Sequence, residues 1–375
     1  MRLALREMRR AKVRFGMLMG AVGLLVFLIL FQQTLLTTLL NFFSGALENQ
    51  SAQVVVYNEE ARKNLEGSVV TPEQVAQTAG VRGVARAEPL GQGSFTVRTS
   101  EETLDASIFG YVLGGPGAPT RLEAGRLPRG AGEGVASDTD AGRGLAIGDR
   151  VQVLGPDGNT PIRIVGLASE SRFSVDPSIF VSYRTFEATT RTKNPDAALI
   201  TPSVVAVTAA SGVDPEVLAS RITRQVPGVE ALDRATAVVS LPGVSGVTTS
   251  FNIILTLAFI VVTLVIGIFF VILTVQKANA LTLLRAIGAG TGYLTRALLV
   301  QVFAVVIGGV AIGAALLALA ALGSSPDFPI SFDLGTVLTR GALVAVLAVI
   351  ASLAAIRRVL RLDPVEATVP MGATR

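Results

Sequence analysis

The sequence predicts an α-helical membrane protein with four transmembrane helices and a large α+β extracytoplasmic domain inserted between helices 1 and 2. Two observations support this fold class. Half of the 375 residues are hydrophobic, only 16% are charged and the mean hydropathy is +0.57, which a soluble chain of this length rarely shows. The apolar stretches also have a distinctive order, with one near the N-terminus and three after a long polar region.

Each apolar stretch contains the roughly 20 residues that a helix needs to cross a bilayer. The first stretch resembles a secretory signal because basic residues precede it. Its apolar part, however, exceeds the about 7–15 residues of a signal sequence and no small-x-small cleavage site closes it, so we expect it to remain as an anchor. We place the transmembrane helices at residues 15–43, 250–276, 297–323 and 334–357.

Charged residues near the helix ends predict the orientation in a plasma or inner membrane. Basic residues gather in segments 1–14, 277–296 and 358–375, whereas the loop 324–333 holds Asp327 and Asp333. Positive residues favour the cytoplasmic side, so both termini are expected there. The clustered positive charges suit anionic lipid headgroups and lack the aromatic interleaving of a single-strand binder, so no nucleic-acid partner is expected.

The polar region 44–249 is expected to form the extracytoplasmic α+β domain. Short β-branched runs at 53–57 and 94–98 predict strands, and the alternation over 149–168 about a Pro-Asp-Gly-Asn turn predicts a hairpin. Two helix starts repeat one pattern, Thr71-Pro72-Glu73 and Asp214-Pro215-Glu216. We interpret them as a duplicated α/β unit with a β-rich insertion near residues 100–190, although a chance repeat of a common helix opening gives the same pattern.

The composition argues against catalysis within this chain. There is no cysteine and no histidine, which removes most metal sites, the usual catalytic triads and any disulfide. A G-x-x-x-x-G-K-[ST] loop for ATP phosphates is also absent. The carboxylates Glu101, Glu102 and Asp105 have no spacing that distinguishes them from a solvated surface. We therefore expect no cofactor and no metal.

The segment 277–296 between helices 2 and 3 carries a short amphipathic pattern. Leu281, Leu284 and Ile287 are three residues apart, on one face of a short helix that also carries Arg285. Such a helix could dock on a partner protein or lie on the lipid surface.

Several motifs together resemble one family. The stretch "LLRAIGA" between helices 2 and 3, the C-terminal "RRVLRLDPVEATVP" and "GLAIGDRVQVLG" in the outer domain resemble the MacB/FtsX-type, or type VII, ABC transporter permeases, which also share the order of one span, an outer domain and three spans. The family usually has a Glu shortly before Leu-Arg-Ala, whereas this chain has Ala278-Asn279-Ala280. Within the family, the chain most resembles HrtB-like hemin exporters and DevC-like permeases.

The resemblance implies a homodimer joined to two copies of a separate ATPase subunit, which supplies the ATP hydrolysis. The expected ATPase-coupling residues are Leu281, Leu284, Arg285, Ile287, Asp363 and Pro364. For Asp363 and Pro364 a simple helix stop is the alternative. Close helix packing is independently suggested by two G-x-x-x-G pairs, whose alternative is ordinary glycine enrichment in membrane helices. These pairs are Gly16 with Gly20 and Gly309 with Gly313.

Three functions fit these features. The first is a permease that exports or extracts a hydrophobic or amphiphilic substrate such as heme, a lipid or a drug-like molecule. The second is an FtsX-like mechanotransmitting permease that controls an extracellular hydrolase without transporting a substrate. The third, a receptor or anchor, would need only one span. The glycine- and alanine-rich spans and the hemin-type resemblance favour the first.

Arg340 is the one charge in the stretch 334–356 of the fourth span, about 9 Å from its outer end. Its side chain could reach the surface by snorkelling, or it could pair with an anionic group of a substrate such as a heme propionate or a lipid phosphate. Met17 and Met19 are the other possible substrate contacts, because methionine can ligate heme iron, but they lie near the opposite end of the membrane from Arg340.

Overall fold

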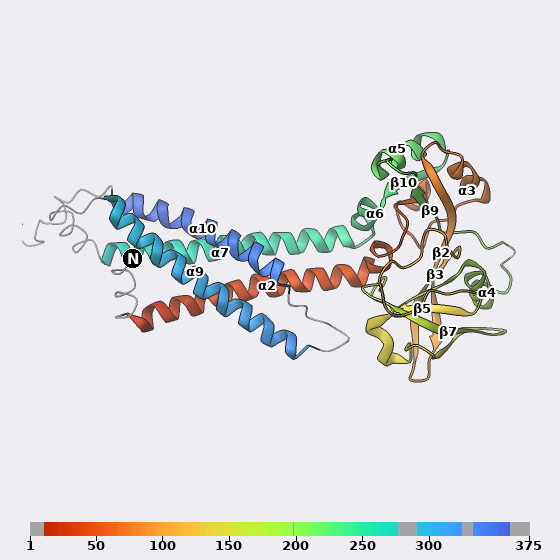
Figure 1. Ribbon diagram of the computed structural model, residues 1–375, viewed down its shortest axis with the longest axis horizontal. Helices are drawn as coiled ribbons and strands as arrows, with labels where there is room; N and C mark the ends of the chain where they lie inside the picture. The colour runs from red at the N-terminus through yellow and green to blue at the C-terminus, as the bar shows by residue number, and fades with distance from the viewer. Residues whose placement is uncertain (1–10, 198, 277–290, 325–332, 361–375) are drawn as a thin grey trace, which may run out of the picture. The chain divides into compact units, whose positions relative to one another are not determined.

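The computed structural model describes residues 11–197, 199–276, 291–324 and 333–360. These residues form two compact units. The membrane unit contains residues 11–36, 249–276, 291–324 and 333–360, and the α+β unit contains residues 37–248 apart from residue 198. Figure 1 shows the long helices of the membrane unit and the sheet and short helices of the α+β unit.

The membrane unit is built from four long helices, α2 (Lys12–Glu48), α7 (Val244–Gln276), α9 (Thr291–Leu322) and α10 (Leu334–Leu360). Each is long and apolar enough to cross a membrane, which confirms the four predicted transmembrane helices. The helices α2 and α7 extend beyond their apolar stretches, so that residues 37–48 and 244–248 belong to the α+β unit.

One hydrophobic core joins these four helices. Val22 of α2, Val262 of α7, Val305 of α9 and Val344 of α10 are almost completely buried in it. Burial of apolar side chains between helices excludes lipid from the centre of the unit, while the remaining faces stay apolar toward the bilayer.

Glycines allow α2 and α9 to approach closely. A Cβ atom added to Gly313 would lie 2.9 Å from the backbone nitrogen of Phe27 and 3.0 Å from the carbonyl oxygen of Gly23. One added to Gly309 would lie 2.5 Å from a methyl group of Val22. Because backbone atoms cannot move aside as a side chain can, a larger residue at Gly313 would separate the two helices.

The α+β unit contains one sheet of ten strands. Nine follow the order β10-β1-β9-β2-β3-β8-β5-β7-β4, and β6 pairs with β2 and β7. The strands are β1 (Val54–Asn58), β2 (Val84–Arg98), β3 (Thr103–Tyr111), β4 (Leu122–Gly125), β5 (Glu133–Ser137), β6 (Arg150–Gly155), β7 (Gly158–Ala168), β8 (Ser178–Ser182), β9 (Val204–Ala209) and β10 (Val229–Asp233).

Two β-α-β units form one end of this sheet. The first contains β1, α3 (Pro72–Ala79) and β2, and the second contains β9, α5 (Pro215–Gln225) and β10. Their strands interleave as β10-β1-β9-β2 with antiparallel neighbours, a split β-α-β arrangement. Both helices pack on the valine-rich face of these strands, so the predicted duplication is confirmed in topology.

Local capping chemistry starts both helices as the sequence predicts. Thr71 forms a capping box with Gln74 at α3, and the carboxylate of Asp214 accepts the backbone N–H groups of Glu216 and Val217 at α5. These side chains satisfy donors that the first helical turn leaves unpaired.

The insertion between the two β-α-β units carries β3 to β8 and α4 (Tyr183–Lys193). The predicted hairpin is confirmed, because β6 and β7 pair antiparallel from Arg150 with Arg163 to Gly155 with Gly158. Phe186 of α4 fills the space above Gly91 and Gly110, where an added Cβ would lie 2.2 Å from a ring carbon of Phe186 at Gly91 and 2.2 Å from its Cβ at Gly110. The insertion thus shares one apolar core with Phe95 and Val97 of β2.

The last turns of α2 are held within the α+β unit by the segment 169–176, which we call the α2 clasp. The backbone N–H of Ala46 donates to the carbonyl of Arg172 at 2.9 Å, and the carbonyl of Phe42 accepts the N–H of Val175 at 2.9 Å. A Cβ on Gly45 would overlap the carbonyl oxygen of Glu170. Val175 has φ 73°, which is a strained conformation for a β-branched residue.

A buried ion pair between Arg172 and Asp140 links the α2 clasp to the rest of the α+β unit. The guanidinium of Arg172 donates from Nε to Oδ2 of Asp140 at 2.9 Å and also from its second nitrogen to Oδ1. Asp140 belongs to the 3₁₀ helix η2 (Asp138–Arg143) and is completely buried. The same guanidinium lies 4.6 Å from the centre of the Phe42 ring, so one arginine joins η2, the α2 clasp and α2.

Candidate functional site

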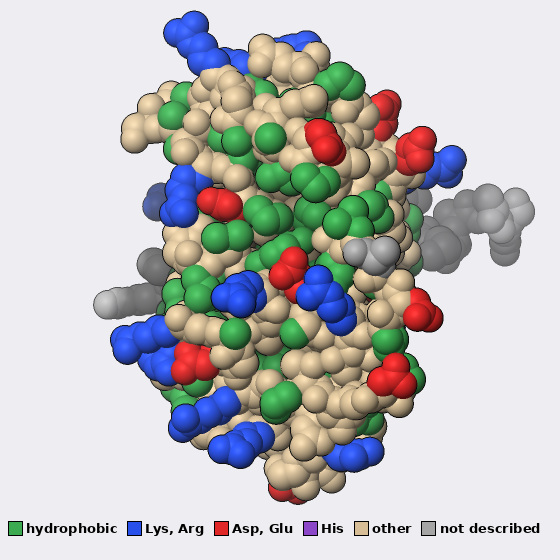
Figure 2. All heavy atoms as spheres, turned by 90° about the vertical axis from the view of Figure 1, so that its right-hand side faces the viewer, with side chains coloured by type: hydrophobic (Ala, Val, Ile, Leu, Met, Phe, Trp, Pro, Cys, Tyr) green, Lys and Arg blue, Asp and Glu red, His purple; other side chains and the backbone are tan. Residues whose placement is uncertain are grey.

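Apart from the buried Arg172–Asp140 pair, the salt bridges of the α+β unit lie at its surface, and none is part of a cluster of reactive groups. Glu102 accepts from Nε of Arg143 at 2.6 Å, and Asp105 accepts from the hydroxyl of Thr96. Within the described residues no group of three or more acidic, histidine or cysteine side chains could hold a metal ion. Figure 2 shows acidic and basic side chains interspersed on one face of this unit.

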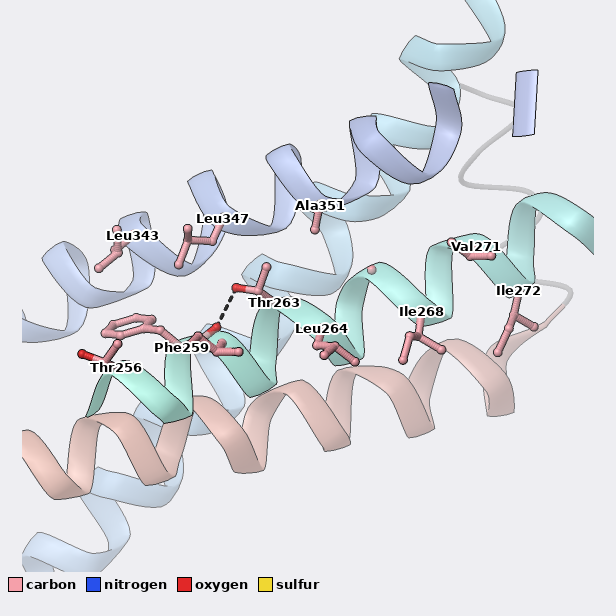
Figure 3. Close-up of a pocket in the computed structure, with 12 residues that line it drawn as sticks. Thr256, Phe259, Thr263, Leu264, Ile268, Val271, Ile272, Leu343, Leu347 and Ala351 are labelled. Atoms are coloured by element: carbon pink, nitrogen blue, oxygen red, sulfur yellow. Dashed lines mark hydrogen bonds between the residues drawn. The ribbon is translucent and has the colours of Figure 1, made fainter. Parts of the chain in front are cut away.

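The membrane unit contains an apolar groove between α7 and α10, with a cavity volume of about 830 Å³. Leu343 and Leu347 of α10 point toward Phe259 of α7 across it (Figure 3). This volume lies in the usual range for small-molecule sites. We call it the α7–α10 groove, and it is lined by Thr256, Phe259, Ile260, Thr263, Leu264, Gly267, Ile268, Val271, Ile272, Leu343, Leu347 and Ala351.

Two small residues of the groove lining bring α7 and α10 close together. A Cβ added to Gly267 of α7 would lie 3.5 Å from the Cβ of Ala351 on α10. Two small residues thus let the helices meet. Phe259 and Leu343 contribute larger apolar side chains to the same lining.

The two polar side chains in the wall do not change the groove's apolar character. The hydroxyl of Thr256 donates to the carbonyl of Asn252 at 2.7 Å, and that of Thr263 donates to the carbonyl of Phe259 at 2.6 Å (Figure 3). Both donors are therefore used within α7. Ile260, Leu264 and Ile268 are each more than half exposed, so the groove can be reached from the apolar surface of the unit.

Polar side chains link α2 to α10 and to α7 within the membrane unit. A terminal nitrogen of Arg340 donates to Oε1 of Gln33 at 2.9 Å. The adjacent Gln32 donates from Nε2 to the carbonyl of Phe251 at 2.9 Å, linking α2 to α7. Arg340 is thus bound to α2 within the chain, a contact that the sequence reasoning missed.

The predicted methionine and glycine positions have separate surroundings. Met17 is 73% exposed, whereas Met19 packs against α9, where a Cβ on Gly308 would lie 2.7 Å from its sulfur. Met19 and Gln33 are 14 residues apart on α2, about 21 Å along the helix, so the methionines and Arg340 do not share a site. At Gly16 and Gly20, unlike Gly309 and Gly313, an added Cβ meets nothing within 4 Å.

The expected ATPase-coupling residues lie outside the described residues. These are Leu281, Leu284, Arg285, Ile287, Asp363 and Pro364. The groove was also missed, because each helix alone shows only a generally apolar composition. The pair of small residues Gly267 and Ala351 is a signal that becomes readable only once α7 and α10 are known to be neighbours.

Four apolar helices, a groove between two of them and an inserted α+β unit define a class, the multi-pass membrane permeases with one large soluble domain. Models of two parts of one family match the chain: the MacB-like periplasmic core domain over residues 15–225 and the FtsX-like permease C-terminal part over residues 252–364. The chain belongs to the MacB/FtsX family of ABC transporter permeases. The fold class that the sequence predicts is confirmed.

Curated relatives align over nearly their whole length. An uncharacterized ABC transporter permease of Mycobacterium tuberculosis is 26% identical, with 97% of this chain and 98% of the relative covered. A putative hemin transport system permease protein HrtB of Staphylococcus haemolyticus is 22% identical, with 98% and 99% covered. Among solved structures, the periplasmic region of MacB from Actinobacillus actinomycetemcomitans is 12% identical, with 50% of this chain and 90% of that chain covered and a TM-score of 0.36.

Proposed function

We propose that this chain is the permease subunit of an ABC transporter that exports or extracts a hydrophobic or amphiphilic substrate. The α7–α10 groove carries this proposal, because it is large, apolar and reachable from the surface of the membrane unit. Membership of the permease family and relatives named as putative hemin transport permeases agree with it. Heme, lipids and drug-like molecules are the candidate substrates.

The proposal includes an assembly and an orientation. The permease forms a homodimer that binds two copies of a separate ATPase subunit, since this chain has no phosphate-binding loop of its own. Both termini and segment 277–296 lie in the cytoplasm, where they meet the ATPase, and the α+β unit lies outside. The basic residues of the N-terminal segment, the 277–296 loop and the C-terminal tail support this orientation.

The test is ATP hydrolysis by the purified complex. The tagged permease is co-expressed with a candidate ABC ATPase subunit of the same organism, purified and placed in nanodiscs. Hydrolysis is then measured with and without hydrophobic compounds. We expect the ATPase to co-purify and its rate to rise several-fold with a transported compound.

Two other outcomes would count against transport. Co-purification without stimulation by any compound, together with loss of an extracellular hydrolase activity in the deletion strain, would indicate a mechanotransmitting permease of the FtsX kind. Absence of any ATPase in the purified sample would leave a receptor or anchor.

A further inference from the structure

The charge of Arg340 is not balanced within the described part of the membrane unit. Its side chain is half-buried and donates to a neutral amide oxygen of Gln33. An amide satisfies one of the five guanidinium N–H donors but carries no negative charge. Asp333 is the one acidic residue among the described residues of this unit, and its oxygens accept from the backbone of Gly335 and Thr336 instead.

Arg340 precedes the residues of α10 that line the α7–α10 groove. Leu343, Leu347 and Ala351 follow it by three, seven and eleven residues along α10. At about 100° per residue these four positions fall on one face of the helix. The helix face that begins with a cation therefore continues as the apolar wall of the groove.

A cation beside an apolar groove selects a specific kind of ligand. The groove offers no free hydroxyl donor from its two threonines, so its occupant has an apolar body. A charged arginine in an apolar environment is costly unless it is neutralised, and guanidinium groups bind carboxylates and phosphates through paired hydrogen bonds. Contact with Gln33 holds the guanidinium in place for such a partner.

We propose that Arg340 binds the anionic headgroup, a carboxylate or phosphate, of an amphiphile whose apolar body lies in the α7–α10 groove. This inference rests on the proposed transport function and names the class of substrate for the same groove. Neutral hydrophobic molecules bind in the groove with lower affinity than anionic amphiphiles, because they leave the charge of Arg340 without a partner.

Matched probes isolate the charge of the ligand. The full-length permease in neutral phosphatidylcholine nanodiscs is labelled with a photoactivatable palmitic acid and, separately, with its methyl ester. Crosslinks to α7 and α10 are quantified by peptide mass spectrometry. We expect Arg340→Gln to reduce labelling by the acid about tenfold, Arg340→Lys to retain much of it, and neither change to affect the ester. Arg296→Gln, which alters an exposed arginine in α9, is the matched control and should label as the wild type does.

A second arm identifies the source of the anion. If phosphatidylglycerol in the nanodisc competes with the labelled acid, the occupant is a bilayer lipid. If it does not compete, the occupant is an added amphiphile, and either result supports an anion site. Equal labelling of Arg340→Gln and wild type by the acid would overturn the inference and leave Arg340 as a snorkelling side chain. Stimulation of the ATPase by a neutral compound in that case would still uphold the proposed function.

Discussion

At the scale of single residues, the ion pair of Arg126 and Glu133 contributes to the response of the α+β unit to acid. Arg126 donates to both carboxylate oxygens of Glu133, and the backbone N–H of Arg129 donates to one of them at 2.8 Å. The hydrogen bond from Arg126 and that from Arg129 lower the pKa of Glu133 to about 2. Because the pKa is lower in the folded state, the ionised carboxylate stabilises that state at neutral pH.

We therefore predict that Glu133→Gln lowers the free energy of unfolding at pH 7. The loss should be only about 1 kcal/mol, because water reaches the Arg126–Glu133 pair and weakens the attraction between its charges. The stabilisation by Glu133 is present above its unfolded pKa and disappears as the pH falls toward about 2. The difference between variant and wild type should thus shrink between about pH 5 and pH 2.

Thermal unfolding of the full chain in detergent, followed by near-ultraviolet circular dichroism of tyrosine, measures this difference. Tyr57, Tyr111 and Tyr183, three of the four tyrosines, lie in the α+β unit. A difference that stays constant across this pH range would show that Glu133 acts through packing rather than charge.

At the scale of elements, the α2 clasp joins the end of a transmembrane helix to the α+β unit. Its ion pair is nearly dry, with side-chain exposures of 7% for Arg172 and 0% for Asp140. Removing one member of such a pair leaves a buried charge without its partner, which typically costs about 3–5 kcal/mol.

We predict that Arg172→Met lowers the unfolding free energy of the α+β unit by about 3 kcal/mol, because Asp140 is then buried without its main cation. Arg121→Met is the matched control. Arg121 pairs with Glu170 at 2.8 Å, but both side chains are about half exposed or more, so the loss should stay below about 1 kcal/mol. Tyrosine circular dichroism measures both. If both changes lowered the free energy of unfolding equally, the buried pair would contribute no more to stability than an exposed pair.

The coupling segment is a second element that can be tested, although it lies outside the described residues. We predict that Leu284→Asp uncouples ATP hydrolysis from transport while the protein still inserts and dimerises, because a charge on the apolar face prevents docking in a groove of the ATPase. Thr282→Asp, which the sequence pattern places on the opposite face of the predicted helix, is the control. ATPase pull-down and transport are measured, and normal values for Leu284→Asp would contradict the docking.

At the scale of the whole molecule, local chemistry made much of the fold predictable. Four apolar stretches gave the transmembrane helices, and the N-caps Thr71 and Asp214 gave two helix starts. Contacts between distant residues could not be predicted. Arg340 and Gln33 are 307 residues apart, and no local periodicity relates them. The α2 clasp depends on the close approach of Gly45 to the backbone of Glu170. A glycine in a helix does not indicate which distant segment will pack against it.

The central claim is that a hydrophobic substrate uses the α7–α10 groove, and transport by the reconstituted complex tests it most directly. Leu347→Trp places a larger side chain in the groove, whereas Leu338→Trp makes the same change on the opposite face of α10, where Leu338 is 63% exposed and outside the groove lining. In proteoliposomes with the partner ATPase, we predict that Leu347→Trp reduces ATP-driven substrate movement at least fivefold and that Leu338→Trp leaves it near the wild-type rate. Unchanged transport by Leu347→Trp, with Leu338→Trp equally active, would contradict the claim.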